Sequence, residues 1–298
     1  MADEIIAGQF VNKAQDLVGQ EQYVAAISCF ESAILNMTTD SDKAAAFNNI
    51  GLCYLKLGNF DEAKIYFNVA ISKNQNYALP FFNRAVLFHD LGDLESALKD
   101  YDCAIKLWPG YASAHNEKGR CLAQQDNLEE ALACFKTAVR IMPNEQSFLG
   151  NAGKMYLLIG NPSNAIFYFI KQASAAPSLS EPYVNISQCY RVLGNVMAAI
   201  NSAELAIKLD ANNASAHEEM GLLMCELKQY SHAVIDFFKA LKISKNPDIV
   251  EHLVVTAGKS EQFKLIQKDC LLERGGEITI FELLRRISPS IEGFIAKK

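Results

Sequence analysis

The sequence lacks any long apolar run, since no uncharged stretch approaches the roughly 18 to 20 residues that a helix needs to span a bilayer. Its first ten residues carry two acids and an apolar run of only two, which is too short for the core of a secretory signal. A Pro/Gly/Ser-rich linker or a block of like charge is missing as well, which favours one continuous body. We therefore expect no direct membrane insertion.

Positive charge is also scarce, because 28 Lys and Arg stand against 34 Asp and Glu, for a formal net charge of −6. Nucleic-acid binding needs a basic surface or stripe, so this balance argues against nucleic acid as the main ligand. The eight cysteines are scattered without a CxxC pair, which fits reduced thiols better than a disulfide framework. We therefore predict a cytoplasmic protein.

Recognisable catalytic motifs are missing too. The histidines do not form HExxH, and "AGKS" at 257–260 lacks the leading glycine of a phosphate-binding loop, because Leu253 stands there. Nothing in the sequence brings a Ser/His/Asp or Cys/His set within hydrogen-bonding reach. We predict that the protein is not an enzyme and needs no cofactor or metal.

What the sequence does have is an internal period of 34 residues. Three columns keep this step, and an earlier copy with Ala14, Ala26, Phe30 and Ala33 precedes them, which makes seven copies. The columns are Gly51, Ala85, Gly119, Gly153, Ser187 and Gly221; Ala63, Ala97, Ala131, Ala165, Ala199 and Ala233; and Phe67, Tyr101, Phe135, Phe169, Ala203 and Phe237.

Within each copy the apolar columns fall at steps of four and three, which predicts one face of each of two successive helices. A turn signal such as "LGN" at 57–59 separates the halves, and Pro162 suits the first position of a second helix. Three copies end at Pro109, Pro143 and Pro177, because proline cannot continue a helix interior. Each copy is therefore predicted to be a helical hairpin.

These columns resemble the tetratricopeptide repeat over about residues 7–247. The resemblance implies an all-α fold, a right-handed superhelical solenoid of stacked antiparallel helix pairs with a C-terminal capping segment. We assign 1–6 to an N-terminal extension, 7–247 to seven hairpins, and 248–298 to capping helices and a tail. We expect Gly51 to face Ala63, where two helices cross closely, and buried aromatic rings to join neighbouring hairpins.

By the same resemblance, first helices line a concave groove that holds a partner. One column there is rich in asparagine, whose amides can hydrogen-bond the backbone of an extended peptide, although asparagine is also simply common at this place in the family. Apolar residues in the amino-terminal half could form pockets for side chains. The predicted groove residues are Asn12, Asn49, Leu52, Phe82, Asn83, Val86, Asn116, Arg120, Asn151, Lys154, Asn185 and Arg191.

The cations Arg120, Lys154 and Arg191 lie in the middle of this set, which suggests a partner segment with an apolar and an acidic part. The alternative is that these side chains merely solvate an exposed face. Substitution of Asn83 and Asn151 by alanine is expected to weaken partner capture and leave folding almost untouched.

The leading hypothesis is a non-catalytic adaptor that binds an extended or helical segment of a partner protein in the groove. The other hypotheses are a self-assembling scaffold, which would make the protein a homo-oligomer, and a regulatory subunit of an enzyme on another chain. The tail at 278–298 either packs on the cap or docks elsewhere, including in a groove.

Overall fold

The computed structural model describes residues 2–244 and, beyond them, 246, 249, 252, 255–257 and 259. The chain forms two compact units, Met1–Met155 and Tyr156–Lys298, which are described separately. Every regular element in the described residues is a helix, which confirms the all-α class. Most of the predicted capping segment at 248–298, with the whole tail at 278–298, lies outside the described residues.

Unit 1 consists of four helical hairpins followed by α9, which contains the boundary between the units. Residues 2–6, assigned above to an extension, belong to the first helix. The helices are α1 (Ala2–Gly19), α2 (Tyr23–Asn36), α3 (Asp40–Lys56), α4 (Phe60–Lys73), α5 (Ala78–Asp90), α6 (Leu94–Leu107), α7 (Ala112–Gln124), α8 (Leu128–Ile141) and α9 (Gln146–Leu158).

Unit 2 continues with α10, whose first residue is the predicted Pro162, and with two further hairpins. Its helices are α10 (Pro162–Ala175), α11 (Glu181–Val192), α12 (Val196–Leu209), α13 (Ala214–Glu226) and α14 (Tyr230–Ser244). The helices α6, α8 and α10 end two residues before Pro109, Pro143 and Pro177, as the prolines predict.

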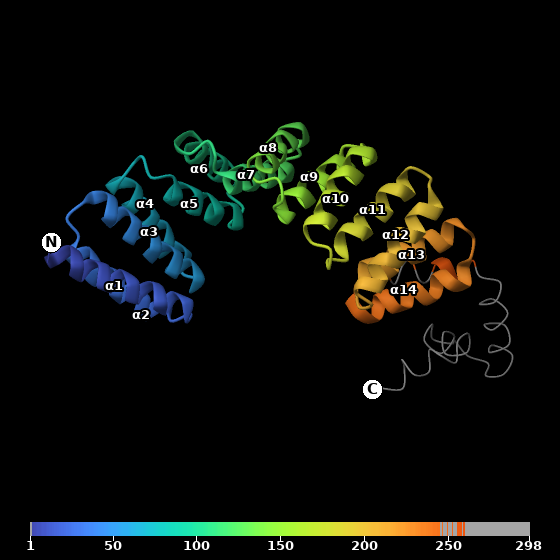
Figure 1. Cartoon of the computed structure of the whole chain (residues 1–298), viewed down its shortest axis with the longest axis horizontal. Helices are drawn as coiled ribbons and strands as arrows, with labels where there is room; N and C mark the ends of the chain where they lie inside the picture. Colours follow the sequence, from blue (N-terminus) through green and yellow to red (C-terminus); the bar gives the residue numbers. More distant parts are fainter. Residues whose placement is uncertain are drawn as a thin grey trace. The chain divides into compact units, whose positions relative to one another are not determined.

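Within each unit the hairpins pack on one another in chain order (Figure 1). The second helix of one hairpin contacts the first helix of the next, as α2 does with α3 and α12 with α13. First helices also contact each other, since α3 meets α5, α5 meets α7, and α11 meets α13. One face of each unit is therefore built largely from first helices.

The repeat columns form the core between the helices. All six residues of the alanine column are fully buried, and Phe67, Tyr101 and Phe169 of the aromatic column are buried as completely. Burial of one such ring contributes roughly 1.5 to 3 kcal/mol to the stability of the fold. A single hairpin cannot bury its apolar face alone, so this contribution requires neighbouring hairpins.

The small column packs closely against the aromatic column. A Cβ atom at Gly51 would lie 2.6 Å from Cε1 of Phe67, so the nearest neighbour of the glycine is the ring. At the equivalent Gly119 a Cβ atom would lie 2.9 Å from Cε1 of Phe135 and 3.1 Å from the backbone oxygen of Ala131, which occupies the position of Ala63. Gly221 meets Phe237 in the same way, at 2.7 Å. The ring lies in the space that the missing side chain leaves, because the aromatic is one helical turn beyond the alanine on the same face. The small column therefore makes room for the aromatic column.

Candidate functional site

First helices of unit 1 line three hollows. The amino-terminal hollow, about 390 Å³, lies mainly between α1 and α3, and the small apolar hollow, about 330 Å³, shares Gln15, Phe30 and Asn49 with it. The central hollow, about 860 Å³, lies along α5, α7 and the start of α9. Its lining residues are Phe82, Val86, Ser113, Asn116, Glu117, Arg120, Met142, Glu145, Ser147, Phe148 and Asn151.

Asn12 and Asn49 both line the amino-terminal hollow, from α1 and α3 respectively. Neither amide forms a side-chain hydrogen bond with another described residue. Asn12 is exposed and Asn49 is half-buried, so both amide groups remain able to donate and accept hydrogen bonds at the hollow.

Asn83 and Asn151 belong to the same column but are held by their neighbours. Nδ2 of Asn83 donates to Oδ1 of Asn48 at 2.8 Å, and Nδ2 of Asn151 donates to Oδ1 of Asn116 at 2.9 Å. The acceptors are buried, with 1% of Asn48 and 3% of Asn116 exposed. Loss of either donor would leave a buried acceptor without a partner, at a cost of about 1–3 kcal/mol. The expectation that these two substitutions leave folding untouched therefore needs correction.

Asn185 is the member of the column that lies in unit 2, and only 8% of it is exposed. Its Nδ2 atom has no hydrogen-bond partner among the described residues. In the two hydrogen-bonded cases the acceptor lies 35 residues earlier, and for Asn185 that position is Gly150, which has no side chain.

A chain of polar contacts crosses the central hollow. Asn116 receives the hydrogen bond from Asn151 and donates its own Nδ2 to Oε1 of Glu117 at 2.9 Å. Oε2 of Glu117 accepts from Nη1 of Arg120 at 2.7 Å. The charge of Arg120 is therefore balanced by a carboxylate of its own helix.

Arg191, in unit 2, is balanced in a similar way. Its Nε donates to Oε1 of Glu219 at 2.7 Å, its Nη2 donates to Oε2 at 3.2 Å, and Glu226 lies 3.8 Å from Nη1. Glu219 is 2% exposed, and burial raises the pKa of its carboxyl, while Arg191 opposes that shift. Arg120 and Arg191 are thus both paired with carboxylates of the protein itself.

A series of aromatic rings leads from the central hollow to the surface. Phe82 lies 4.8 Å from the ring centre of Tyr111, which stacks on Trp108 at 4.5 Å. Trp108 is the single tryptophan of the chain and is 49% exposed. The environment of the Trp108 ring is therefore linked, through Tyr111, to Phe82 in the wall of the central hollow.

The structure brings together only part of the predicted set. Asn12, Asn49 and Leu52 line the first two hollows, and Phe82, Val86, Asn116, Arg120 and Asn151 line the central one. Lys154 is exposed and, like Asn83, lines none of the three.

Sequence reasoning missed Met142, Glu145 and Phe148 in the central hollow. A signal for Phe148 exists, because its column holds Ala46, Pro80, Ala114, Pro182 and Ala216 in the other copies. An aromatic ring in a column that otherwise holds alanine and proline indicates that the surface of this copy differs from that of the others.

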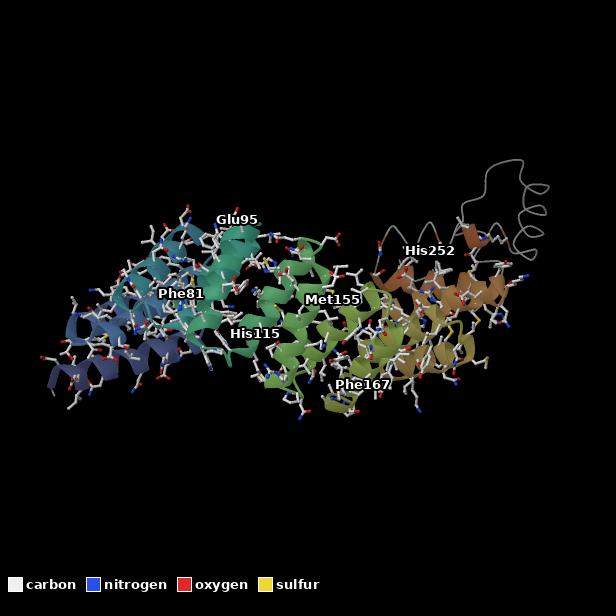
Figure 2. All side chains as sticks on the ribbon, turned by 90° about the horizontal axis from the view of Figure 1, so that it is seen from above. Phe81, Glu95, His115, Met155, Phe167 and His252 are labelled. Carbon is white, nitrogen blue, oxygen red and sulfur yellow. The ribbon has the colours of Figure 1, made fainter. Side chains whose placement is uncertain are left out.

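The histidines His115 and His217 bind backbone carbonyls of the preceding turn. Nε2 of His115, labelled in Figure 2, lies 3.1 Å from the carbonyl oxygen of Pro109, and Nε2 of His217 lies 3.2 Å from that of Ala211. Both contacts span six residues, so repeat symmetry gives the two side chains the same structural role. No cluster of metal-ligating side chains occurs in the part of the chain that the structure describes.

Comparisons with known proteins agree with this architecture. Family models described as tetratricopeptide repeat match residues 44–77, 82–146 and 180–213. The chain is a tetratricopeptide repeat protein. A comparison with curated proteins gives no significant match. Among the described helices, none is long and apolar enough to cross a membrane.

Several solved structures share the fold. A tetratricopeptide repeat protein from Parabacteroides merdae has a TM-score of 0.60 at 22% identity, over 84% of this chain and 98% of that one. YrrB, described as having an unusual peptide-binding site, has a TM-score of 0.52 at 22% identity, over 62% and 96%. The APC/C hetero-tetramer Cut9–Hcn1 has a TM-score of 0.57 at 17% identity, over 83% of this chain and 55% of that one. At these identities the likeness establishes the fold alone.

Proposed function

We propose that this protein is a non-catalytic adaptor, and that unit 1 binds an extended segment of a partner protein along its first helices. The observation that carries the proposal is the pair of unengaged amides, Asn12 and Asn49, at the amino-terminal hollow. A side-chain amide can both donate to and accept from a peptide backbone, and so holds an extended segment with little regard to its sequence.

Apolar side chains of the segment would enter the other hollows. Leu52 lines the small apolar hollow, and Phe82 and Val86 line the central hollow, where Asn116, Arg120 and Asn151 form polar parts of the wall. A few buried apolar anchors usually supply most of the binding energy at such surfaces. The segment is thus held by its backbone at one hollow and by side chains at the others.

The fold supports this proposal, because similar structures include YrrB, with its peptide-binding site, and Cut9–Hcn1, a multi-subunit assembly. The thiols support a non-catalytic role in a reducing compartment, and we propose the cytoplasm. Burial raises the pKa of Cys53 and of Cys189 to about 11, so both remain protonated at neutral pH.

The test compares two pairs of asparagines from one column. Asn12→Ala with Asn49→Ala should weaken binding of a partner segment about tenfold, because two groups that bond its backbone are lost. The free energy of unfolding should stay nearly constant, since neither amide is engaged within the protein. The segment would come from affinity capture and mass spectrometry and be titrated as a synthetic peptide.

The matched pair is Asn83→Ala with Asn151→Ala. These substitutions should lower the free energy of unfolding by about 1–3 kcal/mol for each orphaned acceptor, measured in denaturant. Unchanged affinity in the Asn12 and Asn49 variant, with a folded protein, would rule out the amide contact to the segment.

A further inference from the structure

The charges that line the hollows of unit 1 are mostly negative. Glu4 and Asp42 line the amino-terminal hollow, and Glu117 and Glu145 line the central one. The cations among the lining residues are Arg120 in the central hollow and Lys56 in the small apolar hollow. A segment that lies along these hollows therefore meets more carboxylates than cations.

The central hollow shows the imbalance at atomic detail. Arg120 and Glu117 neutralise each other through the 2.7 Å contact, and the carboxylate of Glu117 also accepts a hydrogen bond from Asn116. Glu145 is half-buried and accepts a hydrogen bond from Oγ of Ser147 at 3.1 Å. No Lys or Arg of the described residues pairs with Glu145. One carboxylate of the hollow thus remains uncompensated.

The amino-terminal hollow repeats the pattern. Asp42 accepts a hydrogen bond from Oγ1 of Thr39 at 2.6 Å, which is part of the cap of α3, and no Lys or Arg is among the residues that line this hollow. The two hollows therefore carry the same sign of charge in the same unit.

We propose that the partner segment carries Lys or Arg next to its apolar anchor residues. In the central hollow an apolar side chain would pack against Phe82 and Phe148, and the adjacent basic group would pair with Glu145. A cation there meets the uncompensated carboxylate, whereas an acidic group would meet a site whose one arginine is already engaged. The inference rests on the proposed binding function and gives the segment a sign of charge opposite to the one that the sequence suggests.

The experiment uses the full chain and a phage library of random twelve-residue peptides. Enrichment of peptides that combine apolar residues with Lys or Arg supports the inference. Enrichment of acidic or uncharged peptides overturns it while leaving the binding function in place. A library without enrichment over an immobilised control protein overturns both.

Substitutions then place the charge contact. An enriched peptide is titrated at low salt, with the fluorescence of Trp108 as a reporter near the central hollow. Glu145→Gln should weaken binding about 3- to 5-fold, and this difference should shrink in high salt, because a partly exposed ion pair is screened. Glutamine retains an oxygen that can accept the bond from Ser147, so folding should not change.

Two further variants serve as controls. Glu129→Gln removes an exposed carboxylate on α8 that lines none of the hollows, and it should not change affinity. Arg120→Gln should strengthen binding of the same peptide by a similar factor, because Glu117 is then released from its ion pair. Equal affinity of the Glu145 and Glu129 variants, or weaker binding by the Arg120 variant, would refute the charge contact.

Discussion

At the scale of single residues, the glycine of the small column is required by the ring that it faces. Gly51→Ala would place a Cβ atom 2.6 Å from the fully buried ring of Phe67, which has no space to move away. We expect the free energy of unfolding to fall by about 1–3 kcal/mol, as for other overpacked cores.

Gly8 provides the comparison for Gly51. It lies in α1 with nothing within 4 Å of an added Cβ atom, so Gly8→Ala should raise the free energy of unfolding by about 0.5–1 kcal/mol. Chemical denaturation of both variants measures the difference. Equal effects would show that helix propensity, and not contact with Phe67, determines the choice of glycine.

Thiol chemistry gives a second prediction at this scale. Because burial raises the pKa of Cys53 and Cys189 to about 11, only about one thiol in a thousand is ionised at pH 8. Both should resist alkylation in the folded protein, whereas the exposed Cys103 should react. Mass spectrometry of labelled peptides tests this, with guanidinium-unfolded protein as the control in which all sites react.

The amide column shows what sequence alone could not reveal. The column itself is visible as a period of 34, but whether a member is available depends on the residue 35 positions earlier, in the neighbouring hairpin. Asn83 and Asn151 have an asparagine there, while Asn49 has Ala14. Attention to that second spacing would have separated the engaged amides from the unengaged ones.

At the scale of elements, all seven hairpins close through the same turn. In each, the residue after the turn donates its backbone N–H to a carbonyl five residues earlier, as Asn59 does to Tyr54 at 2.9 Å and Gln229 to Met224 at 2.8 Å. The residue before this donor has a positive φ, which is the left-handed conformation that glycine favours directly after the C-cap of a helix. Four turns have glycine at this place: Gly58, Gly92, Gly160 and Gly194.

Glu21, Asp126 and Lys228 adopt the same conformation without being glycine, with φ values of 59°, 62° and 59°. Lys228→Gly should therefore raise the free energy of unfolding by about 0.5–1 kcal/mol, since a side chain in this region is strained. Gly194→Lys should lower it by a similar amount. Thermal unfolding of the two variants checks the sign, and a loss of stability in Lys228→Gly would contradict the assignment of strain.

The helices and turns could be predicted because their signals are local. Apolar steps of four and three set each helical face, and the glycines and Pro162 mark where helices end and begin. The turns at Asp126 and Lys228 carry no glycine, so only the repeat period locates them. The hollows were less predictable, because Met142, Glu145 and Phe148 reach the central one from a loop and from the first turn of α9.

At the scale of the whole molecule, the extensive contacts among the described helices join neighbouring hairpins within each unit, as expected of a repeat protein. Phe135→Ala, in α8, should lower the free energy of local unfolding by about 3–5 kcal/mol. Backbone hydrogen exchange should become faster in α7 and α8 and stay nearly constant in α12, α13 and α14.

Phe237→Ala is the mirror control, because it removes the equivalent ring in α14. It should accelerate exchange in α13 and α14 and leave α7 and α8 unchanged. Uniform acceleration along the chain in either variant would show that the protein unfolds as one cooperative body. Exchange followed by mass spectrometry distinguishes these outcomes.

The shared geometry of the seven turns also bears on how such a chain can change its length. Because the turn inside every hairpin uses the same backbone conformation, the duplication or loss of one complete copy would leave the turns of the other copies as they are. The number of hollows offered to a partner could thus grow or shrink by whole copies during evolution, without a new fold element.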